Sequence, residues 1–358
     1  KGELLAGTLF GLYSFDTEMK QWVFIDIPAH DSQVVDLVMK GDSLYVLTRS
    51  YLFCMENRDD GFFFEKITLP PPEGYNNKAG LFKTLCVNHS GDIGGTAGKL
   101  FVDLVGLQFA FVAITGVIYW FFPEWIRRRK RTRRGIEWLK RISRFSLTWH
   151  NKVGAWAVVF LLVTTVTGMF LRPPLLIAIA SEQVARIPFT VLDDPNPWYD
   201  QLRRIIYEEH TGDFIVGTNN GIYYATKGFK EPLMPFAQQP PVSVMGINVF
   251  EKAGAGTYLV GSFNGLFLWN PWRELMVDYY SPGRAVVFDP SGPPLGEHMT
   301  AGMILAEEKH YVFDYNLGLF GFLATKPFPP MPPEIIEESP MSLWNLALEL
   351  HTGRIYSI

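Results

Sequence analysis

The stretch "VNHSGDIGGTAGKLFVDLVGLQFAFVAITGVIYWFFP", residues 87–123, decides the fold. It begins polar and glycine-rich, and from Leu104 to Phe122 it becomes a 19-residue run in which Gln108 is the one strongly polar side chain. A second 19-residue run, from Val153 to Leu171, carries no charge. At about 1.5 Å per residue each run is roughly 28 Å long, close to the roughly 30 Å hydrocarbon core of a bilayer. Neither run has the polar stripe of a core helix in a soluble protein, so the two runs predict membrane-spanning helices.

Between the two runs lies a strongly basic segment. Ten Lys or Arg and one acid fall between Arg127 and Arg144, although the whole chain has a net charge of -4. Short loops rich in Lys and Arg stay in the cytoplasm, so the lipid bilayer explains the cluster and no nucleic-acid partner is expected. Residues 124–152 are predicted to form a cytoplasmic loop with a helix in the inner interface, because apolar residues recur there at helical spacing. These residues are Ile136, Leu139, Ile142, Phe145 and Trp149.

The segments outside the membrane have the alternation of β-structure. "FIVGTNNGIY" at 214–223 flanks an Asn-Gly turn, and the pattern returns as "YLVGSFNGLF" at 258–267 and "LLAGTLFGLY" at 4–13. Weaker copies are "LYVLTRSYLF" at 44–53 and "HYVFDYNLGLF" at 310–320. Such runs predict β-hairpins, and spacings of roughly 40–50 residues suit one four-stranded propeller blade each. A β-sandwich is the alternative for the same strand spacing.

The stretch "IIYEEHTGDFIVGTNNGIYYA", residues 205–225, resembles the propeller repeat in sensor domains of two-component regulators. Residues 1–85 would hold about two blades and residues 191–345 about four, joined as one split all-β domain outside the cytoplasm. Residues 173–190 are too short to span and are expected in the outer interface, and the proline-rich stretch 327–340 is expected to be extended.

Residues 86–123 also resemble the signature of the PepSY-associated transmembrane family. There a His-Thr/Ser-Gly turn and a glycine-containing stretch lead into a helix with Thr-Gly and a terminal Trp. His89, Ser90, Gly91, Gly98, Asp103, Gly106, Thr115, Gly116 and Trp120 fill that pattern. The helix at 153–172, introduced by "WHNKVG", is similar to the family's other helix, through His150, Gly154, Thr167 and Gly168. "LELHTGRI", within residues 346–358, repeats the first motif with His351 and Gly353.

The resemblance implies two tandem units of antiparallel transmembrane helices, of which this chain would lack the first helix and the last. Members of the family include bacterial inner-membrane reductases that bind haem b and pass electrons outward, often to ferric siderophores, and proteins encoded with iron-uptake receptors. The resemblance also implies axial ligation of haem iron by His89, His150 and His351. His89 and His351 would converge on one site at the outer face of the membrane, and His150 would lie at the inner end of its helix. Because no histidine falls within either 19-residue run, these helices are not expected to hold haem at the bilayer centre. The family's PepSY domain is replaced by β segments, which leaves the substrate open.

Other residues have simpler interpretations. His30, His210, His298 and His310 lie in expected loops or strands and are taken as structural. The Thr-Gly pairs of the two runs, Thr115-Gly116 and Thr167-Gly168, are expected to allow close helix packing, together with Gly106 and Gly154. Cys54 and Cys86 could form one disulfide outside the cytoplasm or stay as two buried thiols. No phosphate loop, zinc spacing, nucleophile elbow or dinucleotide fingerprint is present.

Three functions fit the sequence. The first is an inner-membrane electron-transfer protein, a haem-dependent ferric-siderophore reductase, with its β segments in the periplasm. The second is a non-redox propeller module that binds a periplasmic ligand or partner within an iron-uptake system. The third is a structural subunit of such a system.

Overall fold

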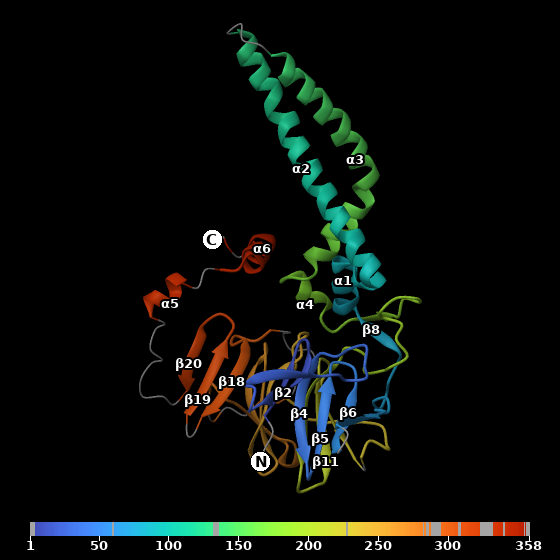
Figure 1. Ribbon diagram of the computed structural model, residues 1–358, viewed down its shortest axis with the longest axis vertical. Coiled ribbons are helices and arrows are strands. Elements are labelled where there is room, and N and C mark those ends of the chain that lie inside the picture. Colours follow the sequence, from blue (N-terminus) through green and yellow to red (C-terminus); the bar gives the residue numbers. More distant parts are fainter. Residues whose placement is uncertain are drawn as a thin grey trace. The chain divides into compact units, whose positions relative to one another are not determined.

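The computed structural model describes residues 4–58, 61–131, 136–226, 228–281, 283, 286–287, 295–306, 309–322, 332–338, 341–353 and 355. The chain divides into two compact units, Lys1–Thr300 and Ala301–Ile358, and each is described by itself. The first unit combines a hairpin of long helices with antiparallel sheets (Figure 1).

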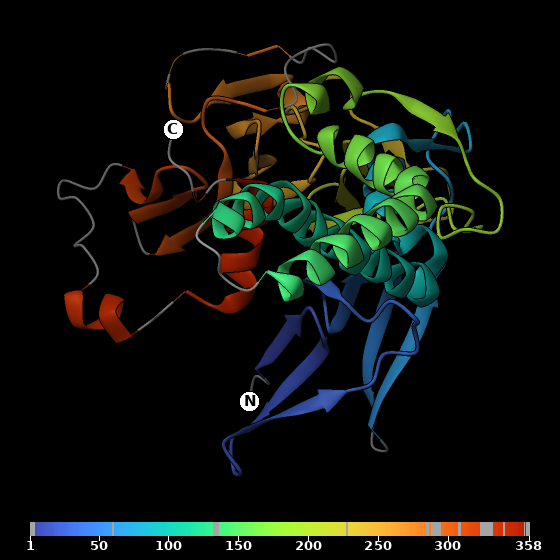
Figure 2. The ribbon, with the colours of Figure 1, turned by 90° about the horizontal axis from the view of Figure 1, so that it is seen from above.

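The two apolar runs form long antiparallel helices. Helix α2 spans Gly95–Arg131 and α3 spans Glu137–Met169, and both are long and apolar enough to cross a membrane. They lie side by side in both ribbon views (Figures 1 and 2). Their apolar side chains point outward, with Trp156 86% and Trp120 74% exposed. Such an exposed apolar surface is stable in lipid and not in water, which agrees with two membrane-spanning helices.

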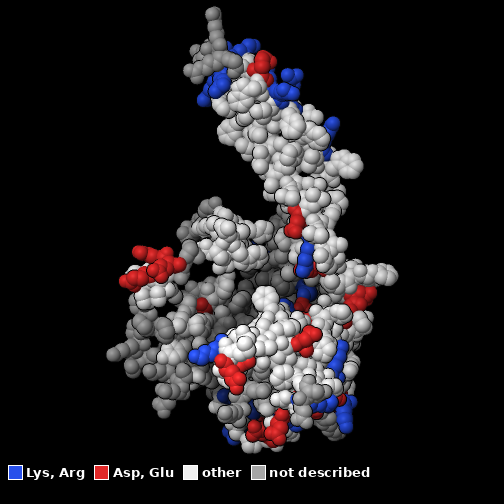
Figure 3. Space-filling model, in the orientation of Figure 1, with Lys and Arg blue, Asp and Glu red and all other residues white. Residues whose placement is uncertain are grey.

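The basic segment is not the loop that the sequence predicted. Residues 124–131 continue α2 and residues 137–152 begin α3, so the expected separate interfacial helix is wrong. Glu124 pairs with Arg127 at 2.6 Å and with Arg128 at 2.9 Å on one helix face. Good helix formers and such ion pairs favour continuing the helix past the apolar run. The charged side chains of the hairpin gather at its end away from the sheets, and an uncharged surface separates them from the rest of the protein (Figure 3).

The β-structure consists of small sheets whose strands follow chain order. The first two are β1 (Leu5–Thr8), β2 (Gly11–Asp16), β3 (Gln21–Ile25), and β4 (Val34–Lys40), β5 (Ser43–Thr48), β6 (Leu52–Arg58), β7 (Gly61–Ile67). The next two are β10 (Leu202–Glu208), β11 (Asp213–Thr218), β12 (Ile222–Ala225), β13 (Met234–Pro235), and β14 (Ile247–Gly254), β15 (Thr257–Ser262), β16 (Gly265–Asn270), β17 (Leu275–Asp278). A fifth holds β18 (Thr300–Ala306), β19 (Lys309–Asp314) and β20 (Gly318–Phe322). Separate meanders of this kind differ from the two packed sheets of a sandwich. In the described part of residues 191–345 there are three sheets, where about four were expected.

All five predicted hairpins are confirmed as antiparallel strand pairs: β1–β2, β5–β6, β11–β12, β15–β16 and β19–β20. Three of the turns are closed by the same hydrogen bond, in which a threonine hydroxyl donates to the main-chain oxygen three residues later. The donors are Thr8, Thr48 and Thr218, at 2.9, 3.3 and 2.8 Å. The repeat in the sequence is therefore a repeat of turn chemistry.

One core joins the β segments on either side of the helices. Leu47 and Leu52 pack in the same buried cluster as Leu202 and Phe214. The side chain of Trp198 is 1% exposed in that cluster, and its indole N–H donates to Pro70 O at 2.7 Å. Two stretches of chain separated by the helical hairpin thus bury their apolar side chains together, which joins the two β segments through one core.

The connections around the helices contain short elements that the sequence did not predict. Helix α1 spans Leu81–Ser90, so the helical part begins before residue 86. Residues 173–190, expected in the interface, contain α4 (Leu175–Ile179) and β9 (Gln183–Ala185), and β9 pairs with β8 (Lys78–Gly80). Cys54 and Cys86 are two free, half-buried thiols, and burial raises the pKa of both.

The second unit contains two helices. Helix α5 spans Pro333–Glu338, inside the stretch expected to be extended, and residues 327–331 lie outside the described residues. Helix α6 spans Leu343–Thr352, so the helix that carries the second His-Thr-Gly motif begins three residues before 346.

Candidate functional site

The first predicted ligand, His89, lies in the last turn of α1 and packs against α3. Its Nδ1 is 2.9 Å from the main-chain oxygen of Thr164 and 3.4 Å from the hydroxyl oxygen of Thr167. A methyl group at Gly168 would lie 2.8 Å from the ring carbon Cε1 of His89. The half-buried imidazole thus fills a socket formed by Thr164, Thr167 and Gly168.

His150 repeats the same contact in the opposite direction, from α3 onto α2. Its Nδ1 is 3.0 Å from Val112 O and 3.3 Å from the hydroxyl oxygen of Thr115. A methyl group at Gly116 would lie 3.1 Å from Cε1 of His150. In both sockets the carbonyl, the threonine and the glycine are spaced i, i+3 and i+4.

This spacing has a physical reason. On a helix the side chain at i+4 leans back over the turn that contains residue i. With glycine at i+4, the carbonyl of residue i stays open to a ring from a neighbouring helix. The threonine hydroxyls bond back to their own helix, Thr167 to Val163 O and Thr115 to Phe111 O, each at 2.7 Å.

The sockets fix the chemistry of both imidazoles. A carbonyl oxygen can only accept, so Nδ1 of each ring is the N–H donor. In the neutral ring the lone pair then resides on Nε2. A histidine held by an Nδ1–H bond to a carbonyl is the usual arrangement of a metal ligand that coordinates through Nε2.

The two sockets are separate. Thr164 is 14 residues beyond His150 on α3, which is about 21 Å of helix. His150 lies in the interior of α3, and its ring contacts the middle of the apolar run of α2, around Val112–Gly116. The expectation that His150 lies at the end of its helix is therefore wrong, while the absence of haem from the bilayer centre stays a prediction. The helices are staggered, so a residue before one run meets the centre of the other.

The third predicted ligand, His351, is exposed in the second unit. It occupies the same place in α6 as His89 does in α1. Both helices have ten residues, with the histidine ninth, and each ends at a left-handed glycine, Gly91 with φ 80° and Gly353 with φ 72°. The sharing of one site by His89 and His351 stays a prediction. Within the described ranges there is no cluster of three or more His, Cys, Asp or Glu side chains that could hold a metal ion.

The turn after His89 is held by a close backbone contact. A methyl group at Gly98 in α2 would lie 2.1 Å from Gly91 O, and one at Gly91 would lie 2.3 Å from Gly98 O. These glycines let the end of α1 touch the start of α2. By contrast, a methyl group at Gly106 or Gly154 would meet nothing within 4 Å. The prediction that these two glycines allow close packing of α2 against α3 is therefore wrong.

A cavity of about 850 Å³ lies at the base of the helices. Helix α1 lines it through Lys83, six residues before His89, and the hairpin turns of two sheets line it through Asn219 and Asn264. Asp200 accepts from Lys83 and forms an ion pair with Arg49, whose Nε lies 2.6 Å from Asp200 Oδ1. The sequence did not identify this cavity, because its walls come from segments far apart in the chain.

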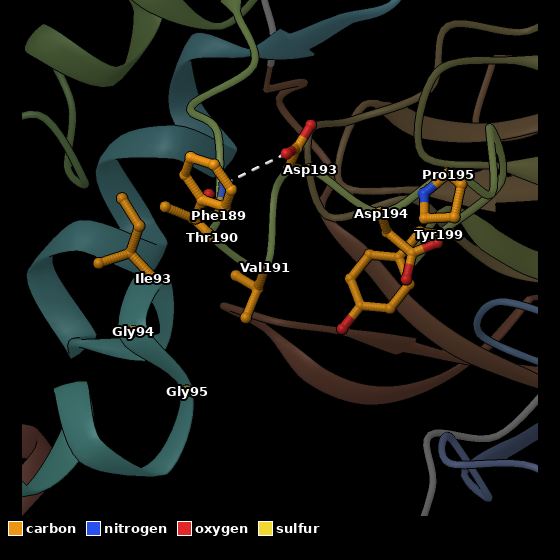
Figure 4. A pocket seen from close by; sticks show the side chains of 10 residues that line it. All are labelled: Ile93, Gly94, Gly95, Phe189, Thr190, Val191, Asp193, Asp194, Pro195 and Tyr199. Atoms are coloured by element: carbon orange, nitrogen blue, oxygen red, sulfur yellow. Dashed lines mark hydrogen bonds between the residues drawn. The ribbon is translucent and has the colours of Figure 1, made fainter.

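A smaller pocket of about 460 Å³ adjoins this cavity, since Val191 and Tyr199 line both. Figure 4 shows the loop at 189–195 facing Ile93–Gly95, the turn between His89 and α2. Asp193 accepts from the main-chain N–H of Phe189 at 3.1 Å and holds the loop in shape. The two spaces therefore extend along the protein from the sheets to the turn after His89.

Among known protein families, residues 65–189 match the PepSY-associated TM region. The match includes both sockets and confirms the resemblance inferred from the sequence, while His351 lies outside it. The chain is a membrane-associated protein with an all-β part.

No curated protein matches the chain. A solved structure, the extracellular domain of a hybrid two-component system protein from B. thetaiotaomicron, is similar with 10% identity and a TM-score of 0.37. That similarity covers 89% of this chain and 25% of the other, so the chain spans a quarter of that protein's length.

Lys83 lines the cavity, and two further cations, Arg49 and Arg203, lie close enough to act on its charge. Burial, followed by the charges of Arg49 and Arg203, lowers the pKa of Lys83 to about 8. Burial and Arg49 also lower the pKa of Arg203 to about 9. Arg203 donates to the main-chain oxygens of Asp200 and Leu202, at 3.1 and 2.8 Å.

A pH dependence of stability follows from Lys83. Its pKa falls from 10.5 to about 8 on folding, so the unfolded chain binds more protons between these values. The free energy of unfolding is therefore expected to rise with pH through this window. From pH 8 to 10 the free energy of unfolding should rise less in Lys83→Gln than in the wild type, whereas Lys252→Gln, at an exposed position, should behave as wild type. If the free energy of unfolding rises equally with pH in all three proteins, the low pKa of Lys83 is contradicted.

Proposed function

We propose that this chain is a bacterial inner-membrane electron-transfer protein that binds haem b and passes electrons to a periplasmic ferric acceptor, a ferric siderophore, in iron acquisition. The observation that carries the proposal is the pair of sockets. In both, Nδ1 of a histidine lies within hydrogen-bonding distance of a main-chain carbonyl oxygen, and Nε2 is then the nitrogen that would coordinate iron.

The donor set fits haem iron. Imidazole is a good axial ligand, and haem supplies one-electron chemistry when bound. His89 and His150 would each give one axial ligand, and His351 would give another by its equivalent place in α6. The chain itself orients each ring through Thr164 or Val112 and keeps the ring among apolar helices. Because the sockets lie about 21 Å apart along α3, they would serve two different irons.

The proposed topology follows from charge. The basic end of the α2–α3 hairpin lies in the cytoplasm, since Lys and Arg are retained there. The sheets then lie in the periplasm, and we interpret them as blades of one propeller split by the helices. Consecutive meanders of three or four strands support this interpretation.

The absorption spectrum of full-length protein from haem-replete cells tests the proposal. We expect a Soret band that weakens in His89→Ala and in His150→Ala and is lost in the double variant. His210→Ala is the matched control, because His210 also precedes Thr-Gly but lies exposed beside a β-turn. A colourless wild-type protein, or a band that neither substitution changes, would refute haem binding at the sockets.

A second function, a non-redox module that binds a periplasmic ligand or partner, is favoured by the cavity of about 850 Å³. Ligand pockets are typically about 300–1,000 Å³, so a small molecule fits. A colourless protein that still binds a ligand would support this alternative.

A further inference from the structure

The cavity at the base of the helices differs from the sockets in its chemistry. Its lining is rich in carboxamides from several segments, and three tyrosines line it as well. The carboxamides are Asn76, Gln183, Gln201, Asn219, Asn220, Gln239 and Asn264. Carboxamides both donate and accept hydrogen bonds, as adjacent hydroxyl groups of a ligand require.

Several polar atoms on this lining have unused bonding capacity. Asn219 Oδ1, Asn264 Oδ1 and Arg186 Nε are buried and find no hydrogen-bond partner among the described residues. The other guanidinium nitrogens of Arg186 donate to Asp194 O at 2.5 Å and to the hydroxyl of Tyr75 at 2.6 Å. Buried polar atoms are normally paired, so three such atoms around one cavity indicate a missing partner.

The wall near α1 adds positive charge. Lys83 and Arg49 pair with one carboxylate, Asp200, which is only partly exposed, and the charges of Arg49 and Arg203 both act on Lys83. The next carboxylate, Asp31, is already bonded to the hydroxyl of Ser50 at 2.7 Å. Glu73 and Glu182 also line the cavity, together with Lys78 and Arg186. The lining itself carries three bases and three acids, so the additional positive charge near Lys83 comes from Arg49 and Arg203, and it would attract one anionic group of a ligand.

We propose that this cavity binds a polyhydroxylated organic acid, with its carboxylate beside Lys83 and its hydroxyl groups on the carboxamides of the hairpin turns. Hydroxyl groups would supply the partners that Asn219 and Asn264 lack. A simple inorganic anion would satisfy the cations but not the carboxamides, and a neutral sugar would satisfy the carboxamides alone. The proposal does not depend on haem.

Calorimetric titration of the full-length protein in detergent tests this assignment, with glucuronate as the probe, glucose as its neutral counterpart and inorganic phosphate as the anion without a carbon skeleton. We expect glucuronate to bind at millimolar concentration or below, at least about tenfold more tightly than glucose or phosphate. Equal binding of glucose, equal binding of phosphate, or no binding of glucuronate at millimolar concentration overturns the proposal.

Two variants connect the binding to the cavity. Lys83→Gln should weaken glucuronate binding about tenfold and leave it similar to glucose binding. Asn220→Ala changes an exposed turn side chain that donates to Gln201 Oε1 at 2.8 Å, so it should fold normally and weaken binding several-fold. Lys252→Gln, away from the cavity, should bind as wild type. Unchanged affinity in both Lys83→Gln and Asn220→Ala would place any binding elsewhere and overturn the assignment.

Discussion

Gly98→Ala is expected to lower the free energy of unfolding by about 3 kcal/mol, near the upper end of the usual cost of overpacking. The new methyl group would lie 2.1 Å from Gly91 O, and both partners in this overlap are main chain. Main-chain atoms cannot rotate away as a side chain can, so α1 must separate from α2. His89 would then be drawn from its socket as well.

Gly106→Ala is the matched control on the same helix. A methyl group at Gly106 meets nothing within 4 Å, so the change should leave stability the same or raise it by up to about 1 kcal/mol through helix propensity. Reversible unfolding in mixed micelles measures both variants. If Gly98→Ala unfolds like Gly106→Ala, the backbone contact between α1 and α2 does not exist in the protein.

Gly168→Ala is expected to displace the ring of His89 and to break its bond to Thr164. The methyl group would lie 2.8 Å from Cε1 and 3.1 Å from Nδ1 of His89. Since the ring is the end of a side chain, it can move, and the energetic cost is smaller than at Gly98. The lost hydrogen bond and the overlap should together cost about 1–2 kcal/mol.

A double-mutant cycle isolates this contact. In a His89→Ala background the socket is vacant, so Gly168→Ala should become neutral or slightly stabilising, and the coupling energy should be about 1–2 kcal/mol. Gly154→Ala, on the same helix with nothing within 4 Å, should show no coupling to His89. Additive effects of Gly168→Ala and His89→Ala would mean that the ring does not occupy the socket.

The two helices and the five hairpins could be predicted from the sequence because each depends on local pattern. An uncharged run of 19 residues and an alternating strand around Asn-Gly have few competing structures. The helix ends were harder to predict. The basic residues favour α-helix as much as they mark the cytoplasmic side, and this is why α2 and α3 extend beyond the apolar runs.

The sequence also identified the histidines but not their partners. Close packing was expected at the Thr-Gly pairs and at Gly106 and Gly154, whereas of these glycines only Gly116 and Gly168 make a close contact, and each leaves a carbonyl open to an imidazole. Which glycine faces the neighbour depends on the rotation and stagger of the two helices, and neither quantity is local. The same holds for Lys83 and Asp200, which are 117 residues apart and meet at one cavity.

The sequence by itself determined that this chain enters a membrane, that its remaining segments form β-hairpins and that a histidine precedes each apolar run. Hydrophobic length, alternation and turn chemistry act within a few tens of residues, so they can be read along the chain. The tertiary structure alone decided that His89 and His150 are each held by a Thr-Gly pair of another helix and that a polar cavity lies at the base of the helices. Those contacts join residues distant in sequence, and only the packing of helices and sheets against one another fixes which groups meet.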